Sequence, residues 1–184
     1  MAIKTFSVNE VLTASDTNTF LANSGLVFIK SDTITTGSSK EITGVFSSTY
    51  NNYRIVISNM KTTVPSGVYI QMGTNAANYY WAGITVGFAS LTISAEGGSN
   101  TSNFNTGIVG SPQRGGGIIE LQSPNRALET TIQCLSTDAR TGGTGGRNNT
   151  GFLNNTTQYT SFTLSVPGTS FESCDIAVYG YRIP

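Results

Sequence analysis

The chain contains no histidine among its 184 residues, and this absence excludes much of the chemistry that enzymes use. Without histidine there is no Ser-His-Asp or Cys-His arrangement, and the usual proton shuttle near neutral pH is missing. Two isolated cysteines, Cys134 and Cys174, do not make a zinc site by themselves. The sequence also lacks the Asp-x-Asn-x-Asp spacing of a calcium loop. We therefore expect no metal, no cofactor and no enzymatic activity.

Charged residues are scarce as well, at 11% of the chain, and the 10 basic residues balance the 10 acidic ones. The basic residues are scattered rather than clustered, so no positive surface is expected to attract nucleic acid. No apolar run reaches the roughly 18 residues of a membrane-spanning helix. The N-terminus does not show the basic and apolar regions of a secretory signal. These absences argue against a nucleic-acid-binding protein, a membrane-spanning protein and a signal-directed secreted protein.

Serine, threonine, asparagine and glycine take the place of charge, while aromatic residues still make up 10% of the chain. Apolar residues alternate with polar ones in short segments separated by turn residues, as in Phe162, Leu164 and Val166. This pattern predicts an all-β body over residues 27–184, an antiparallel β-sandwich of jelly-roll type. The expected strands are 26–30, 40–46, 53–58, 68–72, 79–86, 91–95, 103–109, 117–122, 130–135, 160–166 and 175–182.

Long loops are expected between several of these strands, at 73–78, 96–102, 111–116 and 137–155. The last of them is too long and too rich in glycine for a hairpin, and a loop of this length is usually functional or mobile.

Residues 1–26 differ from the rest because they alone carry helix signals. Thr13 or Ser15 is suited to cap a helix, and Gly25 is suited to end it. A helix of two or three turns is marginal alone, so this segment is expected to dock onto another surface. The apolar residues assigned to that attachment are Phe6, Val11, Leu12, Phe20 and Leu21.

The stretch FSVNEVLTASDTNTFL, residues 6–21, resembles the F-T-A-G-E-x-L-T-A-x-D-x-N opening of many bacteriophage tail-fibre and related virion proteins. The ending DIAVYGYR, residues 175–182, resembles the closing strand of the same group. The chain departs from the pattern at residues 7–9, where the family usually has Thr-Ala-Gly. The resemblance implies a virion structural protein with a β-rich body. It also implies a homotrimer, attachment to other virion proteins, and assembly in the cytoplasm of the bacterial host.

For a protein made in that compartment, two buried thiols at Cys134 and Cys174 are favoured over a disulfide, although the sequence is compatible with both.

The cluster of Tyr79, Tyr80 and Trp81 is the strongest candidate for ligand binding. Aromatic faces stack on the C–H surfaces of sugars, and the amide of Asn78 offers hydrogen bonds to hydroxyl groups. Three consecutive residues of a strand cannot share one face, so Tyr79 and Trp81 are expected to oppose Tyr80. One of the two sets is then core or subunit interface, and packing is favoured over a glycan platform.

Arg140 and Arg147, at the base of the glycine-rich loop, are candidates to contact an anionic sugar or a neighbouring subunit, although such arginines more often solvate a loop. Among the carboxylates only Glu120, on a strand with apolar neighbours, is a catalytic candidate, and we favour an outward-facing structural position over an acid–base role.

The leading hypothesis is a tail-fibre or receptor-binding module that presents its body to host surface polysaccharide. The alternative is a head decoration, knob or tail adaptor without host recognition. A carbohydrate-active enzyme is disfavoured by the sparse carboxylates and the missing histidines.

Overall fold

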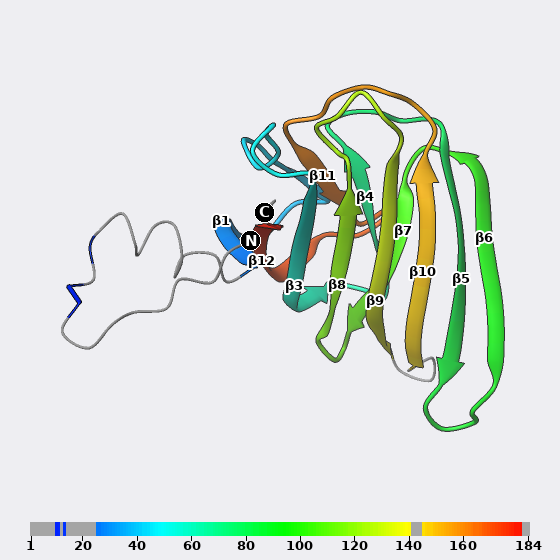
Figure 1. Ribbon diagram of the computed structural model, residues 1–184. Helices are drawn as coiled ribbons and strands as arrows, with labels where there is room; N and C mark the ends of the chain where they lie inside the picture. The colour runs from blue at the N-terminus through cyan, green and yellow to red at the C-terminus, as the bar shows by residue number, and fades with distance from the viewer. Residues whose placement is uncertain (1–9, 12, 14–24, 141–144, 182–184) are drawn as a thin grey trace.

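The chain is all-β in its computed structural model, which describes residues 10, 11, 13, 25–140 and 145–181 (Figure 1). Twelve strands and no helix occur within these residues, which confirms the all-β part of the predicted fold class. In chain order the strands are β1 (Leu26–Ile34), β2 (Ser39–Ile42), β3 (Asn52–Thr62), β4 (Gly67–Met72), β5 (Tyr79–Gly87), β6 (Ile93–Thr101), β7 (Phe104–Ser111), β8 (Gly115–Gln122), β9 (Thr130–Arg140), β10 (Gly145–Leu153), β11 (Phe162–Ser165) and β12 (Phe171–Tyr181).

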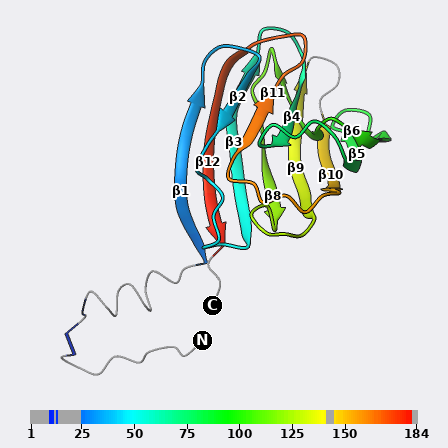
Figure 2. The same ribbon diagram turned by 90° about the horizontal axis from the view of Figure 1, so that it is seen from above.

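Most of the strands form a nearly closed barrel. Hydrogen bonds connect them in the order β1-β12-β3-β8-β9-β7-β4-β11-β2, and this path curls so that β1 and β2 lie close together (Figure 2). Lys40 Nζ on β2 donates to Thr33 O at 3.1 Å and to Asp32 Oδ1 at 2.6 Å, both on β1. From β1, Lys30 Nζ donates to Thr43 O at 3.0 Å. Side chains therefore bridge the gap that backbone hydrogen bonds leave open.

The other three strands form an extension that we call the wing. β10 pairs with β9 and β5 pairs with β10, while β6 pairs with β5 alone among the described strands. Figure 1 shows the wing at one side of the molecule with β6 outermost. Every residue of β7 is buried, because barrel strands pair with it and the wing strands β5 and β10 also contact it.

Two details differ from the predicted antiparallel sandwich. Strands β7 and β9 run parallel where Val109–Ser111 pairs with Asp138–Arg140. All twelve strands also belong to one hydrogen-bonded sheet, so a division into two separate sheets, and with it a jelly roll, is not confirmed. The predicted N-terminal helix lies outside the described residues. Gly25, at its expected end, has a φ of 89°, the left-handed conformation that a terminating glycine adopts.

Alternation of apolar and polar residues builds the barrel core. In β3, Tyr53, Ile55 and Ile57 are buried while the residues between them are more exposed. Large apolar side chains of this kind each contribute about 1.5–3 kcal/mol on burial. The two cysteines belong to the same core as free thiols, and burial raises the pKa of each to about 12. This is the state that the sequence favoured.

The predicted strands all coincide at least partly with observed ones, but two predicted loops are wrong. Residues 96–102 are largely strand β6, and residues 137–155 contain the end of β9 and the whole of β10. Strand β10 lacks the apolar alternation that would reveal it, because Gly145, Arg147 and Asn149 occupy its inner positions. It is held by pairing with β9 on one side and β5 on the other.

Candidate ligand-binding depression on the wing

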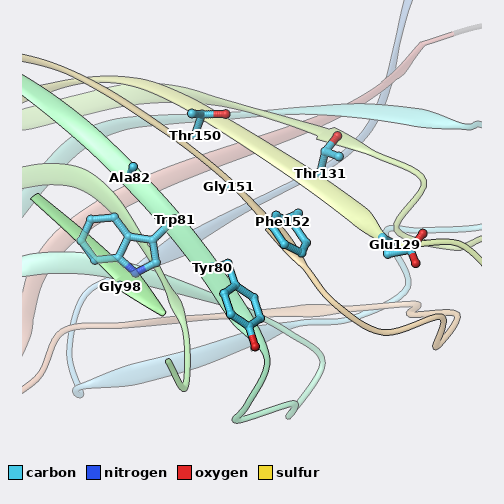
Figure 3. A pocket seen from close by; sticks show the side chains of 9 residues that line it. All are labelled: Tyr80, Trp81, Ala82, Gly98, Glu129, Thr131, Thr150, Gly151 and Phe152. Carbon is cyan, nitrogen blue, oxygen red and sulfur yellow. The ribbon is translucent and has the colours of Figure 1, made fainter. Parts of the chain in front are cut away.

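An open depression of about 590 Å³ lies where β5, β10 and β9 run side by side (Figure 3). Its lining is mainly apolar and includes a single carboxylate, that of Glu129, and two threonine hydroxyls. The lining residues are Tyr80, Trp81, Ala82, Gly98, Glu129, Thr131, Thr150, Gly151 and Phe152.

Two stacked rings line the depression. Tyr80 on β5 and Phe152 on β10 are direct partners in the strand register. Their ring centroids are 5.2 Å apart and their planes differ by 11°, so the cross-strand pair is nearly parallel. Phe152 remains 40% exposed, and its partner on the other side is Thr131 of β9. The cross-strand row of Tyr80, Phe152 and Thr131 therefore places an accessible aromatic ring beside a hydroxyl group.

Trp81 reaches the depression from the other face of β5. Its ring packs edge-on against Phe104 of β7, with the centroids 6.4 Å apart. Gly98, its partner on β6, makes room for the indole, since a Cβ there would lie 2.6 Å from Trp81 Nε1. Gly151 allows an equally close approach of β10, because its Cβ would lie 2.2 Å from Tyr80 O. These two glycines shape the depression and would not accept a larger residue without rearrangement.

The polar groups at the rim are hydroxyl groups and a carboxylate rather than cations. Glu129 is exposed and makes no hydrogen bond or ion pair within the described part of the chain. Thr131 Oγ1 donates to Gln122 Oε1 at 2.9 Å and keeps its acceptor capacity. Among the residues that the structure describes, no lysine or arginine lines the depression. The site therefore suits a ligand with an apolar face and adjacent hydrogen-bond donors.

Tyr79 belongs to the core, which places it apart from the depression. Its hydroxyl accepts from Met72 N at 2.7 Å, and burial raises its pKa to about 12. Asn78 occupies the turn before β5, with a φ of 68°, and its backbone N–H donates to Asn100 Oδ1 at 3.2 Å. The expected division of the aromatic cluster is confirmed, because Tyr79 and Tyr80 lie on opposite faces of β5.

Arg140 and Arg147 lie apart from the depression, in an ion-pair network between wing and barrel. Arg147 donates to Glu96 Oε1 at 2.6 Å and to Asp138 Oδ2 at 2.9 Å. Arg140 Nη2 donates to the same Asp138 oxygen at 2.6 Å. The side chain of Asp138 is fully buried and that of Arg147 is only 9% exposed. Both arginines are therefore committed to protein carboxylates.

Glu120 is also committed to protein partners. Tyr181 Oη donates to it, at 2.8 Å from Oε2, and Arg54 Nε donates to Oε1 at 2.6 Å. Burial, together with the bond to Glu120, raises the pKa of the Tyr181 hydroxyl. Ile119 and Leu121 on either side of Glu120 are buried, so the carboxylate is on the outer face of β8.

Sequence reasoning missed Phe152 and Glu129, the two residues that complete the depression. Phe152 would have been found only by recognising β10 and its register with β5. Glu129 follows a loop, and its nearness to Tyr80 depends on the pairing of β9 with β10. Among the described residues, no group of acidic or cysteine side chains could hold a metal ion, and no helix could span a membrane.

Val11 is the one predicted attachment residue that the structure describes, and its side chain is 78% exposed. The other four, Phe6, Leu12, Phe20 and Leu21, lie outside the described residues.

No protein-family model matches this chain, and no similar curated protein or solved structure was found.

Proposed function

We propose that the chain is a bacteriophage virion structural protein, a small tail-fibre or receptor-binding module. In this role residues 1–26 dock to another virion protein, and the β-body is presented to glycans on the host surface. The resemblance of the chain ends to phage virion proteins supports the structural role. The depression on the wing supports the proposed binding of glycans.

The observation that carries the glycan proposal is the Tyr80–Phe152 stack beside an unpartnered carboxylate. The C–H face of a pyranose packs on an aromatic ring, and its adjacent hydroxyls donate to a carboxylate such as that of Glu129. The described part of the lining offers no cation to an acidic sugar. The ligand class that fits is therefore a neutral hexose rather than a sialic or uronic acid.

Binding without cleavage is the activity that fits this lining. Glycoside hydrolases ordinarily place two carboxyl groups about 5–9.5 Å apart across the bond that they cleave. Among the described residues the depression has one carboxylate, that of Glu129. An open site with a single aromatic stack binds weakly, so several copies in one particle would supply the avidity. The resemblance implies three copies in each assembly.

Adsorption of the labelled full-length protein to host cells tests the proposal, with competition against phage infection. The Phe152→Ala variant should weaken binding roughly tenfold, which corresponds to about 1.4 kcal/mol. Glu129→Gln should also weaken it, because the amide nitrogen replaces one of the two acceptor oxygens. Phe88→Ala is the matched control, since Phe88 is a wing phenylalanine that is 61% exposed and does not line the depression.

Neutral hexose polymers should compete for binding, and acidic polysaccharides should not. A folded protein that does not bind host cells at all would contradict host recognition, and the decoration or adaptor role would become the better account.

A further inference from the structure

The three strands at the ends of the sheet differ in how their edges are covered. Strands β1 and β2 lie close together, and Lys30 and Lys40 bridge them. Strand β2 is also only 4 residues long. Strand β6 is 9 residues long, lies at the outside of the wing and pairs only with β5 within the described residues (Figure 1). Its outer edge is therefore a row of unpaired backbone groups.

β6 shows few of the features that keep edge strands from pairing. Lysine, proline and irregular backbone are the usual protections. No lysine or proline occurs in β6, and its one charged residue, Glu96, is held by Arg147. The register with β5 is regular from Ile93 to Gly98 and shifts only beyond that point. Ile93 is 72% exposed, which is unusual for an edge without a partner.

We propose that β6 pairs antiparallel with β6 of a second copy of this chain, about a two-fold axis at Ala95. The contact is independent of the glycan proposal, because it needs only the backbone edge and the side chains of β6.

Charge and side-chain size favour this register over the one centred on the neighbouring residue, Glu96. Residues directly opposite each other in an antiparallel pair point to the same face of the sheet. A two-fold axis perpendicular to the sheet must therefore lie between a residue and the same residue of the other copy, and this residue defines the register. An axis at Glu96 would place the two carboxylates directly opposite each other, which is unfavourable. An axis at Ala95 places Ser94 opposite Glu96 and Ile93 opposite Gly97. The hydroxyl can then donate to the carboxylate, and each exposed isoleucine covers a glycine.

Symmetry favours a second copy over an unrelated strand. A two-fold contact uses the same patch on both chains and leaves no open edge behind. A three-fold ring built by strand pairing would need a second open edge on each chain, and the remaining edges, β1 and β2, are bridged to each other. The contact therefore predicts dimers, which differ from the trimer that the resemblance implies.

The copy number of the full-length protein is measured by analytical ultracentrifugation. The unmodified protein should be dimeric. Ala95→Lys and Ala95→Glu should each raise the dimer dissociation constant roughly fivefold or more, because like charges would then lie directly opposite. An equimolar mixture of the two variants should restore the dimer, which a folding defect could not do. Ile84→Lys is the matched control, since Ile84 pairs with Ala95 but lies on β5 rather than at the edge.

Ala95→Cys gives an independent readout. Cβ atoms of directly opposite residues lie about 4.5–5.5 Å apart, close enough for oxidation to link the two chains after a small shift. The native thiols are buried, so an exposed Leu128→Cys variant serves as the control for chance cross-linking. A monomer, or a trimer whose mass is unchanged by Ala95→Lys, would overturn the proposal. Backbone amides of β6 that exchange with deuterium at the rate of an open edge would overturn it as well.

Discussion

The barrel and the wing share one sheet but differ in what stabilises them. The barrel surrounds a continuous apolar core, to which β3, β4, β8, β11 and β12 all contribute buried side chains. The wing has glycine and polar residues on much of its inner face, and its outer face is unusually apolar. Of the 12 exposed large hydrophobic residues in the described part of the chain, six lie in β5, β6, β10 or the β5–β6 turn. They are Ile84, Val86, Phe88, Leu91, Ile93 and Phe152.

Polar contacts join the wing to the buried strand β7. Asn149 Nδ2 donates to Asn105 O at 2.8 Å, and Ser136 Oγ, next to the wing on β9, donates to Thr106 O at 3.0 Å. Two buried atoms of this junction, Arg147 Nε and Asn149 Oδ1, have no hydrogen-bond partner among the described residues, and such atoms cost stability. The barrel is therefore stabilised mainly by its apolar core, while the wing depends on polar contacts and leaves apolar side chains exposed.

The largest expected effect is on the barrel core. Phe162 is fully buried and packs beside Phe46, with the ring centroids 5.9 Å apart. Phe162→Ala should lower the free energy of unfolding by about 3–5 kcal/mol, because it removes apolar contacts and leaves a cavity. Phe88→Ala on the wing should change it by less than about 0.5 kcal/mol. Urea denaturation measures both, and similar losses in the two variants would erase the distinction between barrel and wing.

An intermediate effect is expected at the ion-pair network. Asp138→Asn should cost about 3 kcal/mol, because it leaves the largely buried guanidinium of Arg147 with Glu96 as its only charged partner. Hydrogen–deuterium exchange should localise the damage, with faster exchange in β5 and β10 than in β3 and β12. Glu96→Gln serves as the comparison and should cost less, since the Glu96 side chain is 35% exposed. Uniformly faster exchange in every strand would show that wing and barrel unfold as one unit.

The same difference explains what the sequence could predict. Barrel strands such as β3 and β11 follow period-two alternation, because one face of each is buried against apolar neighbours. Strand β10 does not show this alternation. Its inner positions hold polar residues such as Arg147 and Asn149, and glycines that allow neighbouring strands to approach closely. These residues resemble a loop in composition, and only their pairing partners make them a strand.

The candidate site was predictable only in part for the same reason. Tyr80 and Trp81 lie on a strand that the sequence reveals, and alternation correctly separated Tyr80 from Tyr79. Phe152 and Glu129 join them through the register of β5, β10 and β9, which is a long-range property. Arg147 lies on the missed strand, and its partner Glu96 is far away in sequence. An ion pair of this kind cannot be inferred from composition or local spacing.

The smallest expected effect is at the gap between β1 and β2, where the barrel is closed by side chains. The hydrogen bond from Lys40 is the main cause that holds the pKa of Asp32 below its usual value of 3.8. A carboxyl group whose pKa is lowered in the folded state stabilises the fold above its usual pKa, and this contribution is lost as the pH falls through the lowered value. Both side chains are partly exposed, so Lys40→Met should cost only about 0.5 kcal/mol near neutral pH. Urea denaturation of the two proteins should show this difference near neutral pH, and the difference should shrink in acid.

The Asp32→Asn background provides the control for this last prediction. Without the carboxylate, Lys40 retains its bond to Thr33 O, so Lys40→Met should have the same small effect at every acidic pH. A pH-dependent effect in that background would mean that another acidic group interacts with Lys40. A loss of several kcal/mol from Lys40→Met alone would show that the bridges between β1 and β2 contribute as much as the apolar core. The stability of the barrel would then depend on the bridges between β1 and β2 as well as on its buried apolar side chains. Barrel and wing would differ in whether their edge strands are bridged, and not only in how apolar their interiors are.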